Sequence, residues 1–290
     1  MKQSALRWKT GNRQNAVPSR TLIMGVVNVT PDSFSDGGNF LDTEKAIAHG
    51  CQQAGQGADI LDIGGESTRP GADAVSTEEE INRVVPVIRG LREKFPELLI
   101  SIDTSKARVA EAALEAGADI LNDVTAGLGD EGMLPLAASS GAGLVLMHMQ
   151  GRPQTMQKNP QYQDVIQEVA DFFRERMSAA EAAGVQAEQI ALDPGIGFGK
   201  TLDHNLEILS RLNSFQALGR PLLLGVSRKR WLGEITGREV DDRLAASLGG
   251  AAACIFGGAN ILRVHDVIES CDLAKILDKV NQTRLRCLHE

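Results

Sequence analysis

The sequence predicts a single (β/α)8 barrel, an α/β fold, preceded by a short N-terminal extension. Eight runs rich in Ile, Leu and Val alternate with helical patterns along the chain. The runs are continuously apolar rather than alternating, which is typical of parallel strands covered on both faces. Eight such βα units within 290 residues fit this barrel, which usually takes ~250 residues.

An internal repeat supports a series of similar units. The motif Gly-Ala-Asp-Ile-Leu at 57–61 recurs at 117–121 and, with Asn in place of Asp, at 258–262. We expect each glycine to end a helix and lead directly into a strand. An open, doubly wound sheet is the alternative. It needs a Gly-rich nucleotide-binding turn after its first strand, and Asn28-Val29-Thr30-Pro31 is unlike one.

In chain order, the predicted strands cover residues 21–29, 59–64, 99–104, 119–124, 143–149, 189–194, 221–226 and 260–264. The predicted helices cover residues 42–56, 78–95, 106–116, 130–140, 162–183, 202–212, 242–256 and 267–280. The second helix has a start signal, because Ser76-Thr77 is followed by Glu79 and Glu80 as in a capping box. The fourth contains Pro135, which interrupts its helical pattern.

The composition argues against several classes of protein. A net charge of −8 gives no bulk attraction to nucleic acid or to an anionic membrane, so an anionic ligand needs a local cluster of cations. No apolar run approaches the ~18 residues that span a bilayer, and the polar, basic segment 1–20 is not a secretory signal. The four cysteines are far apart, which predicts a reduced, cytoplasmic protein without a zinc site. We assign residues 1–20 to the extension and 21–290 to the barrel domain.

Polar side chains follow most of the predicted strands, where a parallel barrel carries its active site. Asp103, Asn122 and Asp193 end three apolar strands, and buried ionisable groups of this kind are costly unless they bind something. Carboxylate and amide oxygens can accept the N–H groups of a flat heterocycle, and Lys229 can donate to a ring carbonyl. Strand ends therefore predict a pocket for a nitrogen-rich ring.

Other residues at the same predicted mouth suit the rest of such a ligand. Met147 and Phe198 can pack on the ring face. Arg69, Arg263 and His265 can hold a phosphorylated tail, and the Gly-rich segment after the second strand adds backbone N–H groups. The amide oxygen of Asn28, at the root of a long loop, can bind a hard cation.

At these residues the chain resembles the bacterial dihydropteroate synthases. The segments at 28–38 and 62–71 resemble the two signatures of that family. The resemblance continues through Ser101-Ile102-Asp103-Thr104, Asn122-Asp123, Met147-His148, the segment 193–198, Ser227-Arg228-Lys229 and the segment 263–266. It covers residues from about 21 to about 268, and the order of the motifs is specific.

The resemblance implies a reaction in folate biosynthesis. The family joins 6-hydroxymethyl-7,8-dihydropterin diphosphate to 4-aminobenzoate, gives 7,8-dihydropteroate and diphosphate, and uses Mg²⁺. Its pterin-binding positions correspond here to Asp103, Asn122, Asp193 and Lys229, with Met147, Phe198 and Gly225 lining the ring. Its diphosphate contacts correspond to Thr68, Arg69, Arg263 and His265, with Ser227 and Val264 in the same motifs, and its metal position is Asn28. Asp36, in the first loop, is expected to help order the catalytic state, which makes Asp103, Lys229 and Asp36 the expected catalytic set.

Two other functions share parts of this pattern. A pterin-dependent corrinoid methyltransferase needs no diphosphate clamp, so Arg69, Arg263 and His265 argue against it. A non-catalytic pterin-binding paralogue is the second alternative. Arg230 counts slightly for it, because the family usually has Ser there, near the 4-aminobenzoate carboxylate, and the bulkier side chain alters the expected sulfonamide pocket. Family analogy also predicts a homodimer formed through the late helices.

Overall fold

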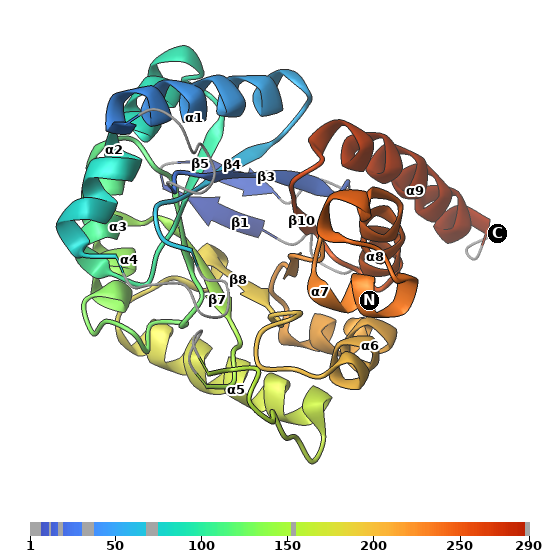
Figure 1. Ribbon diagram of the computed structural model, residues 1–290. Coiled ribbons are helices and arrows are strands. Elements are labelled where there is room, and N and C mark those ends of the chain that lie inside the picture. The colour runs from blue at the N-terminus through green and yellow to red at the C-terminus, as the bar shows by residue number, and fades with distance from the viewer. Residues whose placement is uncertain are drawn as a thin grey trace.

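Eight parallel strands form a barrel at the centre of the computed structural model, which describes residues 7–11, 13–16, 20–30, 38–67, 75–151 and 155–287 (Figure 1). The strands are β3 (Leu22–Asn28), β4 (Ile60–Gly64), β5 (Leu99–Asp103), β6 (Ile120–Asp123), β7 (Gly143–Met147), β8 (Ile190–Asp193), β9 (Leu223–Leu224) and β10 (Ile261–Val264). They pair in the order β8-β7-β6-β5-β4-β3-β10-β9. A bridge between Leu192 and Leu222 joins the two ends, so the predicted closed barrel is confirmed.

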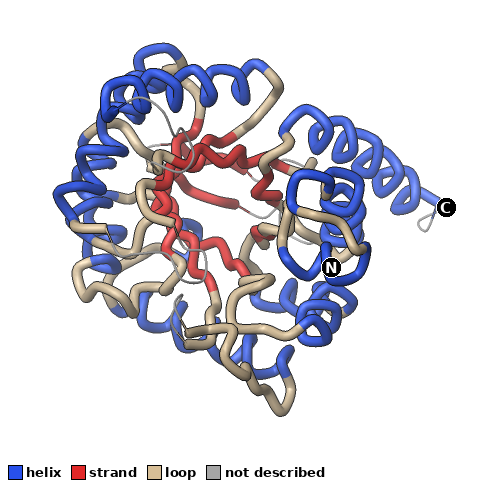
Figure 2. The backbone as a smooth tube through the Cα atoms, in the orientation of Figure 1, coloured by secondary structure: helices blue, strands red, loops and turns tan. Residues whose placement is uncertain are grey.

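Helices surround the strands, as Figure 2 shows. They are α1 (Gly38–Gly55), α2 (Thr77–Lys94), α3 (Ala107–Glu115), α4 (Met133–Ser140), α5 (Val165–Ala182), α6 (Leu202–Ser210), α7 (Arg230–Thr236), α8 (Leu244–Phe256) and α9 (Val267–Cys287). Ser76 caps α2 as predicted, because it accepts a hydrogen bond from the backbone N–H of Glu79. The predicted capping-box glutamates make other contacts, since Glu79 pairs with Arg83 and Glu80 with Lys106. Among these described helices, none has the length and apolar character of a membrane-spanning segment.

The region around β9 differs from the prediction. The run at 221–226 is a regular strand only at Leu223–Leu224, because Leu222 bridges to β8 and the chain leaves the sheet after Leu224. The sequence also does not predict α7, whose seven residues are too few to show a helical period. This short helix starts directly after Lys229 and so ends the loop that follows β9.

The Gly-Ala-Asp repeat has a structural role at the N-terminal end of the barrel. Gly57, Gly117 and Gly258 have φ angles of +104°, +113° and +97°, as expected for glycines that end helices. The third residue of each copy accepts a backbone N–H at the start of the neighbouring strand: Asp59 from Ile23, Asp119 from Ile100 and Asn260 from Leu222, each at 2.9 Å. The repeat therefore also ties adjacent strands together.

The N-terminal extension closes that same end of the barrel. Strands β1 (Arg7–Thr10) and β2 (Arg13–Ala16) form an antiparallel hairpin that contacts β7 and β8. Trp8 is only 2% exposed and packs in one apolar cluster with inward-facing residues such as Met24, Ile60 and Leu223. Its indole N–H donates to the Gln189 carbonyl at 2.8 Å. The barrel interior is thus sealed opposite the strand ends that carry the polar side chains.

Trp8 offers a test of this closure. We expect Trp8→Ala to lower the free energy of unfolding by ~3–5 kcal/mol, the range for deleting a buried aromatic side chain. Trp8→Phe keeps an aromatic ring and loses the indole hydrogen bond, so a loss of ~1 kcal/mol is expected from that bond. Urea unfolding measures both. Equal stabilities for the three proteins would contradict a sealing role for Trp8.

Candidate active site

The polar residues at the strand ends lie together at the C-terminal mouth of the barrel. Asn28, Gly64, Asp103 and Asn122 are in register across β3, β4, β5 and β6, and Asp193 at the end of β8 is in register with Met147 on β7. The two aspartates are 9% and 6% exposed, in chain order. These predicted ring-binding residues therefore lie at the same end of the barrel.

A partly buried arginine lies between two carboxylates at this mouth. Arg263 on β10 donates from Nε to Asp62 Oδ2 at 2.6 Å and from Nη2 to Asp103 Oδ2 at 2.7 Å. Asn122 donates from Nδ2 to the same Asp62 oxygen at 3.1 Å. The predicted diphosphate contact Arg263 is therefore already engaged by two carboxylates, which raise the pKa of its guanidinium.

Asp62 is a site residue that the sequence reasoning missed. It is completely buried in the middle of the apolar strand β4, two residues before Gly64. A charge at such a place is costly unless it is paired, and that cost is the signal in the sequence that could have found it.

Burial shifts the pKa values of the predicted ring-binding groups in the direction that favours their neutral forms. It raises the pKa of Asp103 to about 7, against the opposing effect of Arg263. It raises the pKa of Asp193 to about 6, although the backbone N–H of Gly195 donates to that carboxylate at 2.7 Å. Burial also lowers the pKa of Lys229 to about 8. Its ammonium lies 4.0 Å from the centre of the Phe198 ring, so two predicted pocket residues are in contact.

The loop between β8 and α6 is held by a buried lysine, Lys200, which the sequence reasoning did not single out. Lys200 is 3% exposed. Its Nζ lies within 3.0–3.3 Å of His148 Nδ1 and of the carbonyl oxygens of His148, Gly195 and Phe198. Burial, helped by the Lys200 charge, lowers the pKa of His148 to about 2, so this imidazole is neutral and accepts at Nδ1. The loop that carries Phe198 is thereby fixed to the end of β7.

The loops after β9 and β10 are also joined. Ser227 Oγ accepts the backbone N–H of His265 at 3.3 Å and lies 3.1 Å from its Nδ1. Burial first, and Arg263 next, lower the pKa of His265 to about 3. This low pKa favours the neutral imidazole, which has one N–H donor and one acceptor nitrogen. The role of His265 in holding a phosphorylated tail stays a prediction. Arg228 pairs with Asp266 and has a φ of +57°, rare for a side chain of this size.

The remaining predicted residues differ in burial and in whether the structure describes them. Met147 and Val264 are buried at 3% and 2% exposure, and a Cβ at Gly225 would lie 3.9 Å from the Arg263 side chain. Asp36, Thr68 and Arg69 lie outside the residues that the structure describes. The Arg230 side chain is 83% exposed and pairs with Glu234 at 2.7 Å, one turn along α7.

Comparison with known proteins agrees with this geometry. A family model described as pterin binding enzyme matches residues 24–265, so the barrel and its mouth are those of a pterin-binding enzyme. The dihydropteroate synthase of Escherichia coli (strain K12) is 45% identical over 90% of this chain and 92% of the relative. That of Haemophilus influenzae is 44% identical over 88% and 92%. The chain belongs to the dihydropteroate synthase family.

Solved structures extend the comparison. The Xanthomonas albilineans dihydropteroate synthase with 4-aminobenzoic acid has a TM-score of 0.89 at 45% identity, covering 96% of this chain and 99% of that one. The same enzyme in complex with 7,8-dihydropteroate has a TM-score of 0.84 at 42% identity, with 95% and 98% covered. A Yersinia pestis dihydropteroate synthase with a sulfonamide drug complex has a TM-score of 0.89 at 40% identity, with 96% and 100% covered.

Lys200 provides a test of the loop anchor. We expect Lys200→Met to lower the free energy of unfolding by ~2–4 kcal/mol, because buried carbonyl oxygens lose their donor. Burial lowers the pKa of Lys200 to about 7, from 10.5 in a free lysine. Between these two values the unfolded chain binds the extra proton, so the wild-type protein gains stability as pH rises, and Lys200→Met lacks this gain.

Denaturant titrations at several pH values measure the effect. Lys275→Met is the matched control, because Lys275 is exposed and pairs with Asp272. A stability loss in Lys200→Met no larger than in the control would show that the anchor is unimportant.

Proposed function

We propose that the barrel mouth binds 6-hydroxymethyl-7,8-dihydropterin diphosphate and joins it to 4-aminobenzoate, which gives 7,8-dihydropteroate and diphosphate. The observation that carries the proposal is the convergence of Asp103, Asn122, Asp193 and Lys229 on one pocket, with Phe198 beside Lys229. Relatives of the same family are solved with 4-aminobenzoic acid and with 7,8-dihydropteroate, which supports both the substrate and the product.

Recognition of the ring follows from the donors and acceptors of these side chains. Ionised Asp193 and Asp103 accept hydrogen bonds only, and they suit the amino and ring N–H groups of a pterin. Lys229 donates to the ring carbonyl. Phe198 and Met147 form apolar walls for the ring faces. The positions of Phe198 and Asp193 do not depend on the ligand, because Lys200 and Gly195 already hold their loop.

The reaction is a substitution at the methylene carbon that carries the diphosphate. The carbon–oxygen bond breaks and its electron pair leaves with diphosphate. The amine of 4-aminobenzoate forms the new carbon–nitrogen bond and loses one proton. Asp103 and Asp193, beside an electron-rich ring, stabilise the positive charge that develops on the pterin part. No protein nucleophile is needed.

Cationic and N–H donors near the mouth are proposed to hold the diphosphate. His265 offers an N–H, and Arg263 is oriented there by its two carboxylates. Among the contacts expected from the family resemblance, Thr68 and Arg69 stay predictions, and so does Asp36 as a residue that orders the catalytic state. A diphosphate that approaches His265 would favour protonation of this ring and so raise its low pKa.

Mg²⁺ is the proposed cofactor, and the donors present fit it. The described residues contain no group of three or more His, Cys, Asp or Glu side chains that could hold a metal. Mg²⁺ usually takes only one or two protein ligands together with phosphate oxygens and water. Asn28 offers an amide oxygen at the end of β3, beside Gly64, where a Cβ would lie 3.6 Å from that oxygen. When bound, Mg²⁺ would neutralise the leaving diphosphate.

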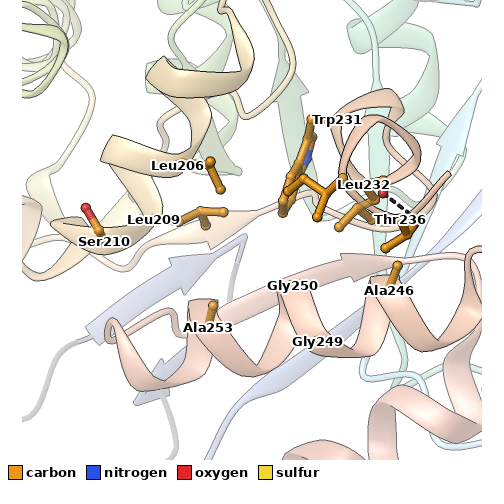
Figure 3. Close-up of a pocket in the computed structure, with 11 residues that line it drawn as sticks. Leu206, Leu209, Ser210, Trp231, Leu232, Thr236, Ala246, Gly249, Gly250 and Ala253 are labelled. Atoms are coloured by element: carbon orange, nitrogen blue, oxygen red, sulfur yellow. Dashed lines mark hydrogen bonds between the residues drawn. The ribbon is translucent and has the colours of Figure 1, made fainter.

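A homodimer and a cytoplasmic location are further parts of the proposal. An apolar pocket of about 340 Å³ lies between α6, α7 and α8 and is lined by residues such as Leu206, Trp231 and Ile235. Figure 3 shows Leu206 and Trp231 at this pocket. Leu206 and Ile235 are 40% and 54% exposed. A second copy of the chain is the proposed cover for this face. Light scattering of the purified protein tests the dimer, and a monomer at all concentrations would contradict it.

An assay of diphosphate release with both substrates tests the function. We expect release that depends on the pterin diphosphate and on 4-aminobenzoate, with 7,8-dihydropteroate formed in equal amount. A non-catalytic paralogue would bind the pterin without release. A corrinoid methyltransferase would release no diphosphate and would transfer a methyl group instead. Either result would contradict the proposal.

Asp193→Asn tests pterin recognition. The change keeps the shape of the side chain but places an NH₂ group against a ring donor, so pterin binding should weaken by ~2–4 kcal/mol. Because the pKa of Asp193 is about 6, wild-type affinity should fall as pH drops below that value and the carboxylate is protonated. In the variant, the affinity should depend less on pH in this range, because the asparagine side chain has no carboxylate to protonate. Calorimetry measures both effects, and unchanged affinity would show that the ring binds elsewhere.

Removal of the metal tests the role of Asn28. Chelation of Mg²⁺ should abolish turnover, and Asn28→Ala should raise the Mg²⁺ concentration needed for half-maximal activity by about tenfold or more, since one of few protein ligands is lost. The control is binding of 6-hydroxymethylpterin, which lacks the diphosphate and should bind both proteins equally. An unchanged Mg²⁺ requirement in the variant would exclude Asn28 as a ligand.

A further inference from the structure

Asp62 occupies the centre of the polar network but is itself out of reach of any ligand. It is completely buried in β4, where it is in register with Val26 on one side and Ser101 on the other. One oxygen, Oδ2, accepts from Arg263 Nε at 2.6 Å and from Asn122 Nδ2 at 3.1 Å. The carboxylate therefore joins residues of three strands, β4, β6 and β10.

The bond to Asn122 decides which end of its amide faces the pocket. A carboxylate only accepts hydrogen bonds, so the NH₂ end of Asn122 must point toward Asp62. The carbonyl oxygen of Asn122 is then the end that remains for a ligand, as an acceptor for ring N–H groups. Without Asp62, either end of the amide could face the ring.

The bond to Arg263 has a similar effect on Asp103. The guanidinium is planar, so its Nε bond to Asp62 fixes the direction of its Nη2 bond to Asp103. That bond uses Oδ2 of Asp103 and thereby orients Oδ1, the second acceptor of this carboxylate. Asp62 thus sets the orientation of two ring-binding side chains that lie on other strands.

We propose that Asp62 is a positioning residue for pterin recognition, which acts through Asn122 and Arg263 and does not touch the substrate. The inference rests on the proposed function, since it assumes a pterin ring at the barrel mouth. It adds a residue to the recognition machinery and assigns its effect to the pterin, not to 4-aminobenzoate.

The charge of Asp62 gives the proposal an electrostatic signature. Asp103 is faced by Arg263 from β10, by Asp62 from β4, by Glu80 from α2, by Asp123 from β6 and by Lys229 after β9. Burial is the main cause that raises the pKa of Asp103, Arg263 lowers it, and the negative charge of Asp62 raises it further. Removal of that charge therefore lowers the pKa of Asp103, so that Asp103 stays ionised at lower pH.

Three variants of the full chain separate these effects. Asp62→Asn keeps an acceptor and removes the charge, whereas Asp62→Ala removes both. Asp119→Asn is the matched control, because Asp119 also pairs with an arginine, Arg92, and accepts a backbone N–H, but at the opposite end of the barrel. Each protein is titrated by calorimetry with pterin diphosphate from pH 5 to pH 8. The KM for 4-aminobenzoate and the thermal stability are measured alongside.

We expect Asp62→Ala to weaken pterin diphosphate binding about tenfold or more, the loss of one to two hydrogen bonds to charged groups. The KM for 4-aminobenzoate should change less than about twofold, because Asn122 and Asp103, which Asp62 orients, are proposed to bind the pterin ring. Asp62→Asn should bind pterin diphosphate well at pH 8. The pH below which its affinity falls should be lower than in the wild-type protein. Asp119→Asn should lose stability with unchanged binding and pH profile.

Two results would overturn the positioning role while the proposed function stands. One is wild-type affinity in Asp62→Ala. The other is an affinity of Asp62→Asn that falls at the same acidic pH as the affinity of the wild-type protein. If Asp62→Ala does not fold, the pH profile of Asp62→Asn decides. A wild-type protein that binds no pterin diphosphate would overturn the proposed function, and this inference with it.

Discussion

The arginine between two carboxylates is the constraint on which the barrel mouth depends. A carboxylate buried as deeply as Asp62 is stable only with a partner, and Arg263 is that partner. Once this pair forms, the guanidinium also reaches Asp103, and the Asp62 oxygen also reaches Asn122. Charges from β4, β5 and β10 therefore become interdependent, although Oδ1 of Asp62 is buried without a hydrogen-bond partner.

The same charges explain why the pocket is suited to a substrate rather than to maximum stability. Burial holds the pKa of Asp103 at about 7 and that of Lys229 at about 8, close to neutral pH. Burial makes both groups costly to keep charged, although Arg263 pairs with Asp103 and Asp193 lies near Lys229. In the proposed complex, the pterin ring would supply donors to the carboxylates and an acceptor to Lys229. These hydrogen bonds would remove part of the cost of burying the charges and so contribute to binding.

Much of the fold and part of the site could be predicted from the sequence, for reasons that particular residues make clear. Continuous apolar runs locate the strands, and the polar residue that ends each run, such as Asn122 or Asp193, must lie at the mouth. Asp62 was missed because its partner Arg263 is far away in the chain, and register across the barrel decides that they meet. Lys200 was missed because its acceptors are backbone carbonyls, which no residue type encodes.

The neutral state of His265 and the seal made by Trp8 could not be predicted for a related reason. The pKa of His265 depends on its depth and on its distance from Arg263, neither of which a motif contains. The extension reads as polar and basic overall, and a single tryptophan within it gives no period from which burial could be inferred. The burial of Trp8 depends on the apolar cluster that it shares with the inward-facing strand residues.

The loop between β8 and α6 has a consequence for how this pocket can vary. Gly195, Gly197 and Gly199 have φ angles of +66°, +83° and +58°. A Cβ at Gly195 would collide with the His148 carbonyl, and one at Gly199 with the Gln150 backbone. Substitution at Gly195 or Gly199 is therefore opposed twice, by backbone conformation and by lack of space, whereas substitution at Gly197 is opposed mainly by backbone conformation. An inhibitor whose contacts are made to this loop therefore faces a wall that the enzyme cannot easily remodel, and resistance has fewer routes there than at exposed positions such as Arg230.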